Sequence, residues 1–165
     1  MVGTETHGAR SWLIVNIGDS RTYLLNSDGL RQLSVDHTVV RELIDAGANS
    51  QAEASSHPSR NLLTRALLGR SEHPADLWLL PMRAGDRVLV CSDGLTNEVD
   101  DRSTAAVLRA VSDPQSAADE LISAAMRAGG RDDATALVID VVAIRAGSVS
   151  DPDGTPSLTA LHAGD

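Results

Sequence analysis

The chain has 165 residues, of which 42% are hydrophobic, and its formal net charge at neutral pH is -9. This length fits one domain with a sizeable core, and the acidic excess argues against nucleic acid or an anionic membrane as a partner. The one cysteine, Cys91, excludes an internal disulfide and a cysteine-rich zinc site. No apolar run approaches membrane-spanning length, so we expect a cytoplasmic protein.

The first part of the chain has the pattern of a strand, a hairpin and a helix. Residues 11–17 are an apolar run that ends at a glycine, which is typical of a buried strand. Residues 21–25 and 30–34 predict a hairpin around a turn of Asn, Ser, Asp and Gly, and residues 39–46 have helical spacing. Residues 48–59 are polar and without pattern, so a mobile surface loop is predicted there.

The second part of the chain predicts two strands, two helices and a last strand. The two strands are residues 76–80 and 87–91, which flank a turn. Residues 103–111 and 114–128 predict the helices, and the second begins with an Asp and a Pro and stops at two glycines. Residues 134–144 predict the last strand.

The uneven order of these elements predicts an α+β layered domain and not a doubly wound α/β sheet. Beyond the last strand, residues 146–165 are rich in Gly, Ser, Asp and Pro. Such a composition buries little apolar surface, so this segment is predicted to be a disordered tail.

Acidic residues stand at the ends of three of the apolar strands. Asp19 follows the first strand, Asp93 follows residues 87–91, and Asp132 with Asp133 precedes the last strand. Because strand ends of one sheet can converge, these carboxylates can meet in space. Clustered carboxylates repel one another, and the cations that oxygen ligands favour are hard ions such as Mg²⁺ and Mn²⁺. Two such ions can activate water and hold a phosphoryl oxygen.

Each acidic residue also has an ordinary structural explanation. An Asp before a Gly is common in turns, and an Asp beside a helix start is a common cap. Taken singly, each of these residues favours the structural explanation. Taken together, with these neighbours, the three positions favour a metal site.

Other polar residues give weaker signals. Arg21 is a weak candidate for binding phosphate or substrate, and the alternative is an ion pair with a nearby acid such as Asp19. Cys91 has no phosphate-binding Cys-x5-Arg loop around it, so a small buried residue is favoured over a catalytic thiol. His37, His57 and His73 stand in loop-like contexts without metal-ligand spacing, and no role is assigned to them.

Four segments, NIGDSRTYLL, LSVDHT, GDRVLVCSDGLTNEV and GGRDDATALVIDV, stand in an order and spacing that resembles a known family. They resemble the C-terminal part of protein phosphatase 2C, the metal-dependent protein serine/threonine phosphatases, in the form found in bacteria. The resemblance implies that residues 1–145 are the C-terminal part of such a domain. The implied fold is a layered β-sandwich flanked by helices on both sides.

The resemblance also implies roles for individual residues. Asp93 and Asp132 would be ligands of a catalytic pair of Mn²⁺ or Mg²⁺ ions, with Asp133 where the family usually has Asn. Asp19 would bind a third, more weakly held ion together with Asp93. Residues 36–59 would be the flap that borders the substrate groove. The implied reaction is hydrolysis of phosphoserine and phosphothreonine in a phosphorylated protein substrate.

Two family motifs are not found in this sequence, an Arg…Asn-Glu-Asp motif and an Asp-Gly-x-Gly-Gly motif. In the family these supply further metal ligands and a phosphate-binding arginine, so a metal pair here is expected to be under-coordinated. The N-terminal strands that carry them are expected to be missing as well. Sheet edges and apolar faces are therefore expected to be exposed.

Three hypotheses for function stay open at this point. The first is a metal-dependent protein phosphatase. The second is a non-catalytic phosphatase-like regulatory or binding module, or one half of a split enzyme, with a partner chain or self-association covering the sheet edges. The third is a cation-binding α+β domain unrelated to phosphatases, which would bind metal tightly by itself.

Overall fold

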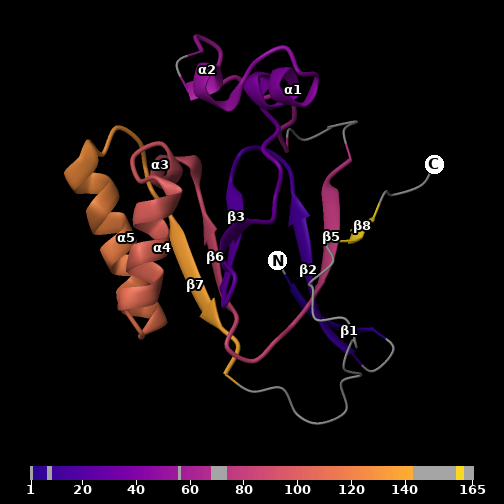
Figure 1. Cartoon of the computed structure of the whole chain (residues 1–165), viewed down its shortest axis with the longest axis vertical. Helices are drawn as coiled ribbons and strands as arrows, with labels where there is room; N and C mark the ends of the chain where they lie inside the picture. The colour runs from indigo at the N-terminus through magenta and orange to yellow at the C-terminus, as the bar shows by residue number, and fades with distance from the viewer. Residues whose placement is uncertain (1, 7–8, 56, 68–73, 143–158, 162–165) are drawn as a thin grey trace.

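The computed structural model describes residues 2–6, 9–55, 57–67, 74–142 and 159–161. Two four-stranded antiparallel sheets pack against each other, as Figure 1 shows. The strand order is β1-β2-β5-β8 in the first sheet and β4-β3-β6-β7 in the second. This arrangement is the predicted α+β sandwich.

The first sheet is built around a long central pair of strands. Its strands are β1 (Val2–Thr6), β2 (Ala9–Asn16), β5 (Asp76–Pro81) and β8 (Thr159–Leu161). Strand β2 pairs with β5 so that Ile14 lies opposite Trp78. Strands β1 and β8 were not predicted. Strand β8 lies inside the segment predicted to be a tail, and the rest of 146–165 lies outside the described residues.

The second sheet contains the predicted hairpin and two further strands. Its strands are β3 (Arg21–Asn26), β4 (Gly29–Gln32), β6 (Arg87–Cys91) and β7 (Ala136–Asp140). Strand β7 pairs with β6 at the edge of the sheet and is shorter than the predicted run over 134–144. Because β2 leads directly into β3, the turn that carries Asp19 passes from one sheet to the other.

Five helices are described: α1 (Val39–Asp45), α2 (Gln51–Ser55), α3 (Asp93–Thr96), α4 (Asp101–Ala110) and α5 (Pro114–Ala128). Figure 1 shows α4 and α5 against the outer face of the second sheet, and α1 and α2 beyond one end of the strands. The expectation of helices on both sides is wrong for the described part of the chain, where one outer face is covered. No helix in these described ranges could span a membrane.

Two apolar clusters hold the layers together. Side chains alternate along a strand, so Leu24 faces the first sheet while Tyr23 and Leu25 face the helices. Between the sheets lie Trp12, Ile14, Trp78, Leu80 and Val88 among others. Cys91 belongs to the helix-side cluster, and burial raises the pKa of its thiol to about 12. Cys91 is therefore a structural residue, as the sequence favours.

The segment predicted as a patternless loop contains helix α2. Its start is a capping box, in which the backbone N–H of Ser50 donates to Glu53 Oε2 at 2.8 Å. In return, the backbone N–H of Glu53 donates to Ser50 Oγ at 3.3 Å. The Ser-x-x-Glu spacing is a local signal for a helix start, so the loop prediction over 48–59 is wrong in this part.

Candidate active site

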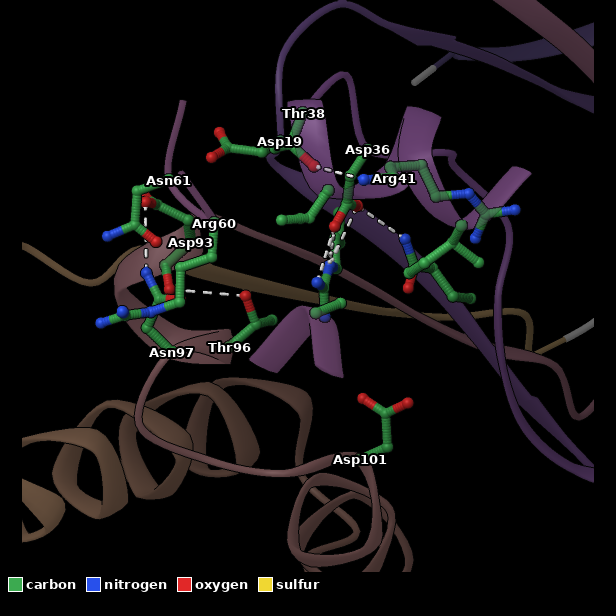
Figure 2. A pocket seen from close by; sticks show the side chains of 15 residues that line it. Asp19, Asp36, Thr38, Arg41, Arg60, Asn61, Asp93, Thr96, Asn97 and Asp101 are labelled. Atoms are coloured by element: carbon green, nitrogen blue, oxygen red, sulfur yellow. Dashed lines mark hydrogen bonds and ion pairs between the residues drawn. The ribbon is translucent and has the colours of Figure 1, made fainter. Parts of the chain in front are cut away.

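A cleft of about 360 Å³ lies at the end of the sandwich where α1 and α3 meet (Figure 2). Its walls come from the β2–β3 turn, from α3 and from the segment that begins at Asp36 and continues past α2. Most of its side chains are polar or charged. They include Asp19, Arg21, Gln32, Asp36, Thr38, Arg41, Arg60, Asn61, Asp93, Thr96, Asn97 and Asp101.

Asp93 is placed by the sharp change from strand β6 to helix α3. Ser92 has extended backbone angles and caps α3, so Asp93 is the first helical residue and lines the cleft. Its carboxylate accepts a hydrogen bond from Asn97 Nδ2 at 3.3 Å. Gly94 is required beside it because a Cβ at this position would collide with the carbonyl oxygen of Asp133. The Ser-Asp-Gly sequence therefore allows a second loop to approach Asp93.

That second loop carries Asp132. It is pinned to the end of β6 by Ser92, whose N–H donates to Thr135 O at 3.1 Å and whose Oγ accepts from Thr135 N at 2.9 Å. The Asp132 side chain is exposed and accepts a hydrogen bond from the backbone N–H of Asp133 at 2.8 Å. The structure thus brings the loop to Asp93, but Asp132 does not line the cleft.

Asp19 lies across the cleft from Asp93, in the turn after β2. Burial raises the pKa of its carboxyl, and the negative charge of Asp93 raises it further. Two carboxylates that repel each other in one polar cleft form a partial ligand set for a hard cation. Within the described ranges no group of three His, Cys, Asp or Glu side chains is close enough to bind a metal ion. Two of the three predicted ligands are thus together.

Replacing Asp19 by Asn is expected to stabilise the protein at neutral pH in the absence of divalent cations. The folded-state pKa of Asp19 is raised, so its ionised form costs stability above the unfolded pKa, and this cost disappears as the pH falls through the folded pKa. Thermal unfolding with and without Mn²⁺ measures this. Asp19→Asn should raise Tm without metal and reduce the further rise with Mn²⁺, and both differences should shrink at acidic pH.

The matched control is Asp28→Asn, which changes an exposed carboxylate in the β3–β4 turn. This control should leave Tm unchanged with and without Mn²⁺. A lower Tm for metal-free Asp19→Asn would contradict the proposed repulsion, and an undiminished effect of Mn²⁺ would contradict the role of Asp19 as a ligand.

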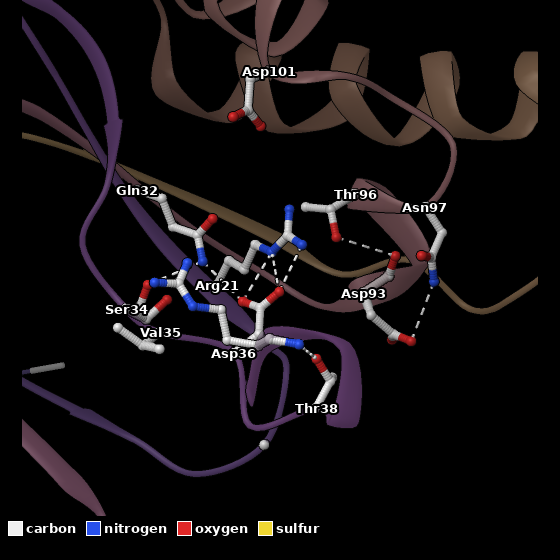
Figure 3. Close-up of polar contacts among 12 residues, drawn as sticks. Arg21, Gln32, Ser34, Val35, Asp36, Thr38, Asp93, Thr96, Asn97 and Asp101 are labelled. Atoms are coloured by element: carbon white, nitrogen blue, oxygen red, sulfur yellow. Dashed lines mark hydrogen bonds and ion pairs between the residues drawn. The ribbon is translucent and has the colours of Figure 1, made fainter. Parts of the chain in front are cut away.

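Arg21 is held by Asp36 and not by Asp19 (Figure 3). Its Nε donates to both carboxylate oxygens of Asp36 at 3.0 Å, and its Nη2 donates to Oδ2 at 2.6 Å. Its Nη1 donates to the Tyr23 hydroxyl at 3.1 Å, which in turn donates to Asp101 at 3.0 Å. Burial lowers the pKa of Arg21, but the hydrogen bonds and charges of Asp36 and Tyr23 together outweigh it and raise the pKa. The geometry therefore favours the ion-pair alternative over phosphate binding.

Arg60 was not predicted from the sequence to be a residue of the cleft. Among the described residues three arginines line the cleft, and two of them are paired: Arg21 with Asp36, and Arg41 with Asp45 at 2.8 Å. The exposed guanidinium of Arg60 has no partner among the described residues, and it lines the same cleft as Asp93 (Figure 2). A single arginine in a polar loop has no periodic signal, so only the folded chain identifies it.

His37, to which no role was assigned from the sequence, is buried and only 3% exposed. Its ring contacts the backbone of Gly18, the residue before Asp19. The ring reaches that turn from the flap segment, 19 residues along the chain. The segment LSVDHT, which contains His37, contributed to the family resemblance, but nothing in it indicated a role for the histidine.

The chain is similar to known phosphatases in sequence. The family model of stage II sporulation protein E (SpoIIE) matches residues 56–142. Serine/threonine protein phosphatase PstP of Mycobacterium tuberculosis is 43% identical over 161 residues, which are 92% of this chain and 30% of that protein. Serine/threonine phosphatase stp of Listeria monocytogenes is 39% identical over 128 residues, 78% of this chain and 51% of that protein. The chain thus spans about half or less of these relatives.

The same likeness is found among solved structures. The crystal structure of the Mycobacterium tuberculosis serine/threonine phosphatase PstP/Ppp has a TM-score of 0.77 at 38% identity, covering 86% of this chain and 58% of that one. The catalytic domain of PstP in complex with two manganese ions has a TM-score of 0.73 at 40% identity, covering 81% and 54%. These matches confirm the predicted sandwich fold.

Proposed function

The chain belongs to the protein phosphatase 2C family of metal-dependent serine/threonine phosphatases, and we propose that its cleft is a site for hydrolysis of phosphoserine and phosphothreonine in proteins. The observation that carries this proposal is the pair Asp19 and Asp93. They reach one cleft from turns that follow different strands, and Asp93 raises the pKa of Asp19. The test is Mn²⁺-dependent release of phosphate from a phosphothreonine peptide.

Mn²⁺ or Mg²⁺ would be held by Asp93 and Asp19, with Asp132 as a further ligand on the neighbouring loop. When bound, such an ion activates water and neutralises charge on phosphoryl oxygens. The chain's own part is to orient the carboxylates: Asn97 holds Asp93 through a hydrogen bond, and Gly94 makes room for the loop of Asp132. The family membership excludes the third hypothesis, a cation-binding domain unrelated to phosphatases.

The substrate would enter between α3 and the flap. Helix α1 and the residues after α2 form the wall of the cleft that faces α3 (Figure 2). Phosphate esters are bound by charge-assisted hydrogen bonds, for which a guanidinium is well suited. Arg60 is the arginine of this wall whose donors have no partner in the described part of the chain. We therefore assign to Arg60 the contact with the phosphate of the substrate.

Replacing Arg60 by Gln is expected to raise KM for a phosphothreonine peptide by about tenfold or more, since a hydrogen bond to a charged group is lost. The control is Arg41→Gln, because the guanidinium of Arg41 is already paired with Asp45. Steady-state kinetics in saturating Mn²⁺ compares the two variants. Equal values of KM in Arg60→Gln and Arg41→Gln would contradict the assignment.

A second candidate function, a binding module or one half of a split enzyme, is favoured by exposed apolar side chains on the strands. Val15 is 46% exposed, and Leu137 on the edge strand β7 is 55% exposed. An open sheet edge with apolar side chains is a surface for pairing with another chain. We propose that a partner chain or a second copy covers this edge if the chain does not hydrolyse phosphopeptides. Sedimentation of wild type and Leu137→Lys tests self-association, which the charge should reduce.

A further inference from the structure

One buried residue, His37, makes two hydrogen bonds to the turn that carries Asp19, one to the carbonyl and one to the N–H of Gly18. The backbone N–H of His37 donates to the carbonyl oxygen of Gly18 at 3.0 Å. The backbone N–H of Gly18 donates to the ring Nδ1 of His37 at 3.1 Å. Gly18 has a φ of 102°, which other residues rarely adopt, so the turn has an unusual path that these two bonds maintain. The backbone of this turn sets the direction in which the Asp19 side chain points.

The two partners of the His37 ring select the same tautomer. Because Nδ1 accepts from a backbone N–H, the ring proton is on Nε2, which donates to Asp76 Oδ2 at 3.0 Å. The other oxygen of Asp76 accepts from Arg65 Nη1 at 2.8 Å. Burial alone would raise the pKa of Asp76, but the hydrogen bonds from His37 and Arg65 outweigh it and lower the pKa. Asp76 is therefore an ionised acceptor.

The backbone of residues 37–39 also binds the segment that follows the flap. The backbone N–H of Thr64 donates to His37 O at 2.9 Å, and that of Val39 donates to Leu62 O at 3.0 Å. Residues 62–65 therefore run beside residues 37–39, directly after Arg60 and Asn61 of the cleft wall. Arg65 connects the same segment to Asp76. Residues 62–65, the ring of His37 and the Asp19 turn are therefore joined by one chain of hydrogen bonds.

We propose that His37 is a positioning residue for Asp19: its ring, held in one tautomer by Gly18 and Asp76, orients the Asp19 carboxylate toward Asp93 and couples it through Arg65 to residues 62–65. This proposal rests on the proposed role of Asp19 as a metal ligand. It assigns no proton transfer to His37. It makes the chain of contacts Arg65–Asp76–His37–Gly18 the route by which a change in residues 62–65 alters the affinity for a divalent cation.

The first test needs neither metal nor substrate, and it uses NMR on the whole chain. In the parent, the ring ¹⁵N shifts of His37 should indicate a proton on Nε2, and the Gly18 amide should be protected from exchange. In Asp76→Asn the amide can pair with either tautomer, so only the Gly18 N–H still selects the proton position. The ring shifts should move toward those of a mixture of tautomers, and Gly18 should exchange faster by up to about tenfold, as for loss of one hydrogen bond. Asp45→Asn, which removes the exposed partner of Arg41, is the control and should change neither. Unchanged shifts and exchange in Asp76→Asn would overturn the proposal.

The second test measures binding of Mn²⁺ by electron paramagnetic resonance. His37→Gln should weaken binding about 10- to 100-fold, the usual effect of losing a group that orients a ligand. In the Asp19→Asn background the same change should have no further effect, because a residue acting through Asp19 has nothing left to position. Equal weakening in both backgrounds would overturn the proposal. A parent chain that binds no Mn²⁺ would contradict the proposed function, and the exchange experiment then decides the role of His37 by itself.

Discussion

Replacing Asp93 by Asn is expected to abolish Mn²⁺-dependent release of phosphate from a phosphothreonine peptide, with a loss of about 10²- to 10³-fold or more. Three features of Asp93 support its role as a metal ligand. It lines the cleft, it raises the pKa of Asp19, and it lies beside the loop that carries Asp132. Asn keeps the shape of the side chain and removes the charge, so the variant reports on metal binding and not on packing.

Two further measurements make the result of Asp93→Asn interpretable. Thermal unfolding without metal should show a folded variant with a Tm at or above that of the parent, because repulsion with Asp19 is removed. Asp28→Asn, with its exposed carboxylate in the β3–β4 turn, should retain full activity. Equal activity of the parent and Asp93→Asn would contradict the role of Asp93. A parent without activity at any Mn²⁺ concentration would favour the binding module.

Replacing Arg87 by Met is expected to lower the free energy of unfolding by about 3–5 kcal/mol, the usual cost of removing one partner of a buried ion pair. The Arg87 side chain is 11% exposed and binds Asp140 through Nε at 2.6 Å and Nη2 at 2.7 Å. It also donates to the carbonyl oxygens of Leu108, Val111 and Ser112. One guanidinium therefore joins β6 to β7 and satisfies the C-terminal end of α4.

Urea unfolding of three variants separates the ion pair from general effects of losing an arginine. Arg127→Met removes the exposed pair with Glu120 and should cost about 0.5 kcal/mol or less. The double variant Arg87→Met/Asp140→Leu should recover part of the stability, because no carboxylate is left without its partner. Similar losses in Arg87→Met and Arg127→Met would contradict the structural role of Arg87.

The central strands and the two long helices could be predicted because their signals are local. Strand β6 matches its apolar run, and α5 matches the helix predicted from its Asp cap, first-turn proline and final glycines. The edge strands β1 and β8 could not be predicted, since their sequences contain no apolar run or clear alternation. They are strands because β2 and β5 offer them backbone hydrogen bonds.

The candidate site divides in the same way. Asp93 and Asp19 could be chosen from the sequence because each follows a buried strand beside a glycine, a pattern written within a few residues. The partner of Arg21, the unpaired guanidinium of Arg60 and the burial of His37 were decided by the tertiary structure alone. Arg21 and Asp36 are 15 residues apart, and His37 and Asp76 are 39 apart. Periodicity records which side of an element is buried, whereas the meeting of distant polar side chains depends on how the sheets and the flap are arranged around the cleft.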